Sequence, residues 1–109
     1  MNGYGSFVSQ LAISRIEVYN MIFREKDREV IRVLEEYYEE MGELIECFIR
    51  DFPDKLNIIG AYYIPHDSPR EYFRLLARTL ETHLVDSNIG SEIMGFIAST
   101  RCKLENAYA

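Results

Sequence analysis

The stretch VIRVLEEYYEEMGELIECF, residues 30–48, decides the fold, because two patterns run through it at once. Its apolar side chains recur in alternating steps of four and three residues, which is the spacing of one helix face. They are Val30, Leu34, Tyr37, Met41, Leu44 and Phe48, with Ile31, Tyr38, Ile45 and Phe52 in a flanking row. So wide a stripe is typical of a helix in a bundle core, and Pro53 is expected to end it.

The polar positions of the same stretch are strongly acidic. Between residues 35 and 46 there are six glutamates and no lysine or arginine: Glu35, Glu36, Glu39, Glu40, Glu43 and Glu46. Like charges three or four residues apart on a helix repel by about 0.2–0.5 kcal/mol per pair. Helical spacing places these carboxylates on the solvent side, either as an ordinary solvated face or as an acidic ridge that docks on a basic surface.

A further helix is predicted before this one, over residues 7–23, and it is apolar more than halfway round. Its main stripe is predicted to be Phe7, Val8, Leu11, Ala12, Ile16, Tyr19, Ile22 and Phe23, with Ile13, Val18 and Met21 off that stripe. Such a helix is either the central one of the domain or one that faces a partner. Asp27 can cap the next helix, and one long bent helix is the open alternative.

Two more helices follow. In HDSPREY, residues 66–72, Ser68 as N-cap, Pro69 at the first position and Glu71 at the third make a capping box. The helix after it is expected to bury Tyr72, Phe73, Leu76, Leu80 and Leu84, and the last helix, from about residue 88, Ile89, Ile93, Phe96, Ile97 and Leu104. Residues 54–65 are expected to be a short helical or extended connector. The prediction is an all-α, four-helix bundle-like single domain over residues 1–109.

Composition excludes some classes of function. The 109 residues carry a net charge of −6, so direct binding to nucleic acid or to anionic lipid is not expected. The chain shows no signal-peptide pattern and no apolar run of about 18 residues, which favours a cytoplasmic protein. Cys47 and Cys102 stand in no CxxC arrangement, and we expect two free, buried thiols, with a disulfide as the open alternative.

A basic ridge is predicted on the third helix, where Arg70, Arg74 and Arg78 follow one another at four-residue spacing. It can pair with the glutamates, within one chain or between copies in a homo-oligomer, or bind phosphate. No metal or cofactor is expected. A di-iron bundle needs inward glutamates and two Glu-x-x-His motifs, and neither His66 nor His83 stands in such a motif.

Arg78 and His83 give the one enzymatic alternative. Their Arg-x4-His spacing in an all-helical chain resembles the signature of HEPN-domain ribonucleases. The resemblance implies a homodimer in which this pair assists attack of a ribose 2′-hydroxyl on the adjacent phosphate. The chain departs from that signature in having Thr79 where Asn or Asp usually follows the arginine, and in placing the pair in the middle of a helix.

A second resemblance lies in the order of an acidic helix, FPDKLNIIGAYYIP and a helix that begins with DSP. This order is similar to that of the nuclease-colicin immunity proteins, which are small acidic four-helix proteins. The resemblance implies that Tyr62 and Tyr63, with the glutamates of the second helix, bind a basic nuclease. This chain is longer, has Ile64 between the tyrosines and the proline, and is predicted to carry a further helix.

These patterns predict a small acidic protein-binding module more than an enzyme, of the inhibitor, immunity or antitoxin type or a phage-encoded anti-defence factor. It would block a basic, nucleic-acid-handling partner protein through its glutamate-rich helix. The residues predicted to engage the partner first are Glu35, Glu39, Glu43 and Glu46, with Tyr62 and Tyr63 as anchors beside them. A ribonuclease and a self-assembling structural helical protein are the alternatives.

Overall fold

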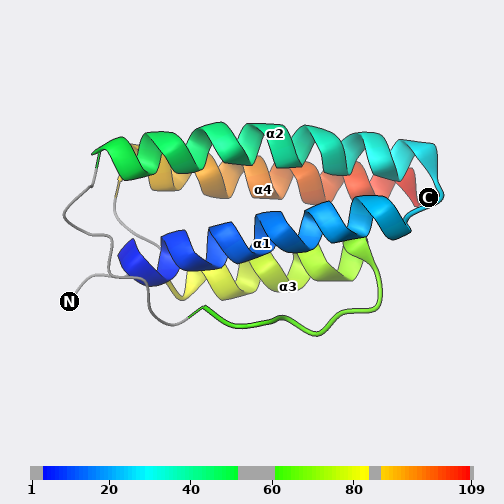
Figure 1. Cartoon of the computed structure of the whole chain (residues 1–109), viewed down its shortest axis with the longest axis horizontal. Helices are drawn as coiled ribbons and strands as arrows, with labels where there is room; N and C mark the ends of the chain where they lie inside the picture. The colour runs from blue at the N-terminus through cyan, green and yellow to red at the C-terminus, as the bar shows by residue number, and fades with distance from the viewer. Residues whose placement is uncertain (1–3, 52–60, 84–86, 109) are drawn as a thin grey trace.

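The computed structural model of the protein describes residues 4–51, 61–83 and 87–108. They form four helices in a body of 40 × 23 × 20 Å: α1 (Tyr4–Arg24), α2 (Arg28–Asp51), α3 (Pro69–Glu81) and α4 (Asn88–Ala107) (Figure 1). The all-α, four-helix prediction is confirmed. Of the predicted connector, residues 61–65 are extended rather than helical, and residues 54–60 lie outside the described residues.

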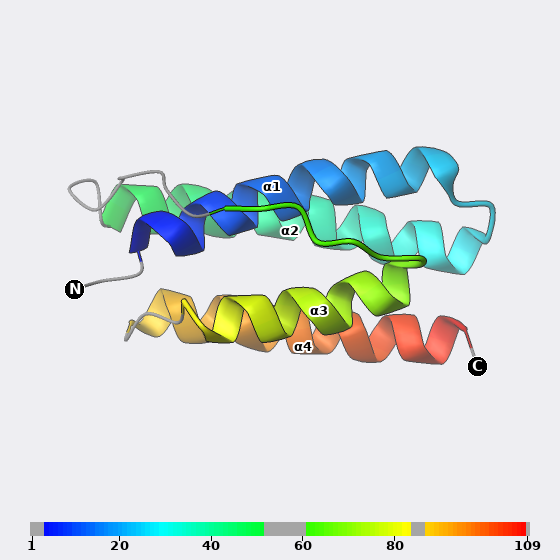
Figure 2. The same cartoon turned by 90° about the horizontal axis from the view of Figure 1, so that it is seen from below.

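All neighbouring helices run antiparallel. α1 pairs with α2 and α3 with α4, and the two pairs pack with α1 against α3 and α2 against α4 (Figure 2). Because α2 ends far from the start of α3, residues 61–68 run back along the length of the bundle. We call this segment the strap. The fold is therefore a four-helix bundle with one long crossover connection.

The helix boundaries follow the caps. Asp27 Oδ1 accepts a hydrogen bond from the Glu29 N–H at 2.9 Å, so the first two helices are separate. The predicted capping box is present in a shifted form. Ser68 Oγ accepts from the Glu71 N–H at 3.2 Å, and the Glu71 carboxylate accepts at 2.7 Å from the N–H of Asp67, one residue before the cap.

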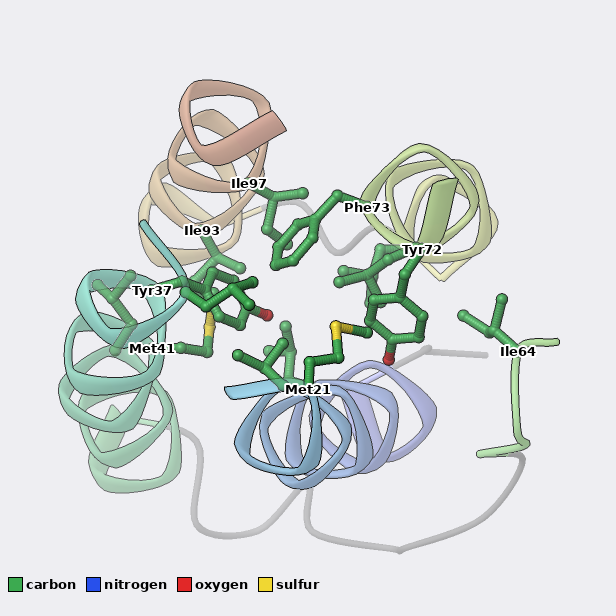
Figure 3. Packing of buried hydrophobic residues seen from close by; sticks show 14 of the residues in the cluster. Met21, Tyr37, Met41, Ile64, Tyr72, Phe73, Ile93 and Ile97 are labelled. Carbon is green, nitrogen blue, oxygen red and sulfur yellow. The ribbon is translucent and has the colours of Figure 1, made fainter. Parts of the chain in front are cut away.

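The core lies between the four helices, with Tyr37 of α2 at its centre (Figure 3). The Tyr37 ring packs edge-on against Phe73 of α3 at 4.7 Å and lies parallel to Phe96 of α4 at 5.9 Å. Its hydroxyl is 2.8 Å from Ser14 Oγ of α1, and burial raises the pKa of this hydroxyl far above its usual range. The main predicted row of α2 is buried as expected from Val30 to Phe48. The flanking row is only half-buried at Ile31, Tyr38 and Ile45, and Phe52 lies outside the described residues.

The predicted stripe of α1 was wrong over its second half. Val18 and Met21 are buried, although the pattern placed them off the stripe. Ile16, Tyr19 and Phe23 were predicted to be in the core, yet they are 63%, 46% and 72% exposed. The buried row of α1 also includes the polar residues Ser9, Gln10 and Ser14. A pattern of apolar residues alone therefore did not identify this row. Both cysteines are free, as expected, but neither is buried: Cys47 is half-buried and Cys102 is exposed.

Candidate protein-binding groove

An open groove runs between α1 and α2 on the surface of the bundle. Two hollows of about 610 Å³ and 440 Å³ make it up, and they adjoin each other, because Tyr38 and Glu39 line both. From α1, the larger hollow is lined by Ala12, Arg15 and Ile16, and the smaller one by Tyr19, Ile22 and Phe23. The residues of α1 that the sequence pattern wrongly placed in the core therefore form one wall of this groove.

Four of the six glutamates form the other wall. Glu39, Glu43 and Glu46 line the larger hollow, and Glu35 and Glu39 line the smaller one. We call these four residues the acidic rim. The other two point elsewhere: Glu36 pairs with Lys103 of α4, which lowers the pKa of that carboxyl, and Glu40 is exposed and lines neither hollow. The acidic face of α2 is thus divided between the groove and the side facing α4.

Aromatic rings and one guanidinium are in mutual contact along the groove, from the α1 wall to Tyr38 of α2. The Phe23 ring meets Tyr19 edge-on at 4.9 Å, and Tyr19 lies 5.5 Å from the Tyr38 ring. The Arg15 guanidinium stacks on the Tyr38 ring, with its Cζ atom 3.8 Å from the ring centroid. Arg15 Nε also donates a hydrogen bond to the Tyr38 carbonyl at 2.8 Å. These contacts hold Arg15 against α2 and join the aromatic rings of the two helices.

Gly42 allows Arg15 to lie flat against α2. A Cβ atom at residue 42 would stand 2.6 Å from Arg15 Nη2, which is too close for the present position of the guanidinium. Arg15 is the one cation among the described residues that line the two hollows. Because four carboxylates face this single guanidinium, the groove as a whole is negatively charged.

Tyr62 and Tyr63 lie on the strap, on the opposite flank of α1. The Tyr62 N–H donates to Gln10 Oε1 at 3.2 Å, and Gln10 Nε2 donates to the Tyr62 carbonyl at 3.1 Å. Both tyrosine side chains are more than half exposed. Figure 3 shows the strap, marked by Ile64, on the α3 side of α1, with α2 on the other side. The structure thus does not place these tyrosines beside the acidic rim.

The basic ridge lies exposed along α3. Arg74 pairs with Glu105 of α4 at 3.2 Å, and the Arg70 guanidinium lies 5.1 Å from the Tyr108 ring centroid. Within the described residues, the ion pairs that join the arginines of α3 or the glutamates of α2 to another helix all lead to α4. The helices α2 and α3 themselves lie diagonally across the bundle from each other. Pairing of the two ridges inside one chain is therefore not what the structure shows, and pairing between copies stays a prediction.

The sequence pattern placed the Arg78–His83 pair in the middle of a helix, but the structure places it at the end of one. Arg78 is exposed in the last turn of α3, and His83 follows the C-cap residue Thr82. Neither residue lines the groove. Over residues 4–51, 61–83 and 87–108, no three His, Cys, Asp or Glu side chains are grouped so that they could hold a metal ion. No helix in the same ranges combines the length and apolarity needed to cross a membrane.

Compared with protein-family models, curated proteins and solved structures, the chain gives no match. The resemblances to HEPN-domain ribonucleases and to colicin immunity proteins rest on the quoted residues alone and stay predictions. Sequence reasoning left open that α1 faces a partner, but it missed that Ile16, Tyr19 and Phe23 form an exposed apolar wall. Its signal was present, because a helix that is apolar more than halfway round has more apolar surface than one core can cover.

Proposed function

We propose that this protein is a small acidic binding module that blocks a basic partner protein, in the manner of an inhibitor, immunity protein, antitoxin or anti-defence factor. The observation that carries the proposal is the acidic rim, because four carboxylates stand along one open groove whose α1 wall exposes aromatic rings. Apolar patches that are rimmed by polar residues mark interaction sites in soluble proteins. Two free cysteines support a reducing, cytoplasmic site of action.

The chemistry divides the work between the two walls of the groove. Exposed ion pairs contribute only about 0.2–1 kcal/mol each, so the rim sets orientation and association rate more than affinity. Affinity then comes from the apolar area of Ile16, Tyr19 and Phe23. If the partner handles nucleic acid, the rim occupies the basic surface that otherwise holds phosphate groups, and the partner is inhibited by competition.

An affinity pull-down from host lysate tests this proposal, with the native protein and a rim variant carrying Glu35, Glu39, Glu43 and Glu46→Gln. A matched control removes the same charge elsewhere, at exposed positions, through Glu40→Gln, Asp51→Asn, Glu81→Gln and Glu92→Gln. We expect one basic protein to be retained by the native protein and the control at low salt, and to be lost with the rim variant and at high salt. Equal retention by the rim variant would contradict the proposal.

A further inference from the structure

We infer that the groove between α1 and α2 binds an amphipathic helix of the partner, whose apolar row lies on Ile16, Tyr19 and Phe23 and whose basic residues follow one flank only. This inference rests on the proposed function, because it takes from it a basic partner. It adds which part of that partner is recognised and which residues anchor it. A helix laid into an apolar groove is a common mode of peptide recognition, with anchors at steps of three and four residues.

The two walls match each other in length and direction. The exposed wall of α1 runs from Ala12 to Phe23 and the rim runs from Glu35 to Glu46, so each covers about 16 Å of helix. Because α1 and α2 are antiparallel, Glu35 lies beside Phe23 and Glu46 beside Ala12. A ligand helix of about three turns therefore spans the apolar row and the carboxylates together.

The exposed acidic charge lies on one side of the apolar row. Beyond it on α1, the exposed residue Asn20 is neutral. Glu17 is turned away: its side chain is 14% exposed, it lies 3.0 Å from His66 of the strap, and it pairs with Arg24. A ligand helix with cations along a single flank fits this arrangement, and one with acidic residues on that flank is repelled by the rim.

A second copy of this chain does not supply such a helix. The large apolar side chains exposed in the described residues are Ile16, Tyr19, Phe23, Ile49, Tyr62 and Tyr63, and none of these lies on α3 beside the arginines. Two copies joined through the groove itself would bring their acidic rims together, which like charges oppose. The rim repels phosphate backbones and anionic lipid for the same reason. A basic helix from another protein is the occupant that remains.

Synthetic peptides of about four turns provide the test. The probe has leucines at positions i, i+4, i+7 and i+11 and lysines along one flank. A first twin has glutamates in place of the lysines, and a second has a central proline that breaks the helix. Binding is measured by fluorescence anisotropy, and its place by amide chemical-shift changes in the native protein. We expect binding of the lysine peptide, and binding weaker by about tenfold or more for both twins.

Variants of the protein decide where the peptide lies. Ile16→Ser with Phe23→Ser should weaken binding by about tenfold or more, whereas Ile49→Ser, an exposed apolar residue outside the groove, should not. No binding of the lysine peptide at about 1 mM would overturn the inference. So would an equal loss in a Tyr62→Ser, Tyr63→Ser variant, since the ligand would then cross the strap. Circular dichroism checks that each variant is folded.

The same variants separate this inference from the proposed function. In the lysate experiment, the partner can be lost with the rim variant and kept by the Ile16→Ser, Phe23→Ser variant. The acidic-module proposal then stands and the helix inference fails. If the partner is lost with the apolar variant and kept by the rim variant, the acidic mechanism fails, and with it the basic flank of the ligand. Loss with both variants supports both.

Discussion

Both flanks of α1 carry apolar side chains, but one flank is covered by the chain and the other is exposed. Toward α3, the strap covers the helix: Ile64 is buried, and Gln10 forms two hydrogen bonds with the backbone of Tyr62. Toward α2, no described segment covers it, and Ile16 and Phe23 remain exposed. The crossover connection thus completes one groove from within the chain. Under the proposed function, the apolar surplus of α1 serves two tasks, one internal and one directed at a partner.

The polar groups beside the two grooves support the same distinction. On the covered flank they bind the strap: the His66 ring lies 3.0 Å from the Glu17 carboxylate and 4.7 Å from the Tyr72 ring. On the open flank Arg15 bonds to the backbone of α2 and stacks on Tyr38, leaving the rim carboxylates facing solvent. Charges without internal partners are the ones available for steering an association.

The largest expected effect comes from truncating the same residue type in each groove. Ile64→Ala should lower the free energy of unfolding by about 2–4 kcal/mol, because it leaves a cavity beneath the strap. Ile16→Ala should change it by about 0.5 kcal/mol or less, since this side chain is already in water. Urea unfolding followed by circular dichroism measures both. Similar losses for the two variants would mean that the groove beside α2 is also closed in solution.

A smaller effect is expected for Gln10→Leu, which keeps the bulk of the buried side chain but removes both hydrogen bonds to Tyr62. Leaving the partly buried backbone of the strap without these partners should cost about 1–3 kcal/mol. Limited proteolysis should then cut within residues 61–68 faster than in the native protein. Unchanged stability together with unchanged proteolysis would show that the hydrogen bonds do not hold the strap, and would weaken the contrast between the flanks.

The sequence predicted the buried row of α2 better than that of α1, and the reason is physical. In α2 the polar positions are nearly all charged, so a single row could be buried, and the row from Val30 to Phe48 was predicted correctly. In α1 apolar residues stand on several sides, and the buried row includes uncharged polar residues such as Ser14, which bonds to Tyr37 in the core. Periodicity alone cannot rank such rows, because the choice depends on which neighbours supply hydrogen bonds.

The groove was predictable only in part for the same reason. Helical spacing placed all six glutamates on the exposed side of α2, and all six are exposed. It could not show that four of them border α1 while Glu36 meets Lys103, since this depends on the order of helices around the bundle. That order follows from the crossover connection, whose path leaves no periodic pattern in the sequence.

The smallest effects on stability are expected where Glu36, which pairs with Lys103, is compared with the glutamates of the acidic rim. Lys103→Met should lower the free energy of unfolding at pH 7 by about 0.2–1 kcal/mol, because the Glu36–Lys103 pair is nearly half exposed and screened. Pairing lowers the pKa of Glu36, so its contribution is present above the unfolded carboxyl pKa of about 4.3 and is lost as the pH falls through the lower folded value. The difference between native and variant proteins should therefore shrink as the pH falls below about 4.3.

Glu39→Gln on the rim should act in the opposite direction at pH 7. It removes repulsion from Glu35 and Glu43 without breaking an ion pair described in the structure, and should stabilise the fold by about 0.2–0.5 kcal/mol for each of the two pairs. Thermal and urea unfolding at pH 7 and pH 3 measure both variants. If Glu39→Gln instead destabilised the protein as much as Lys103→Met, the rim would be satisfied within the chain, and its carboxylates would not be free to receive a basic helix.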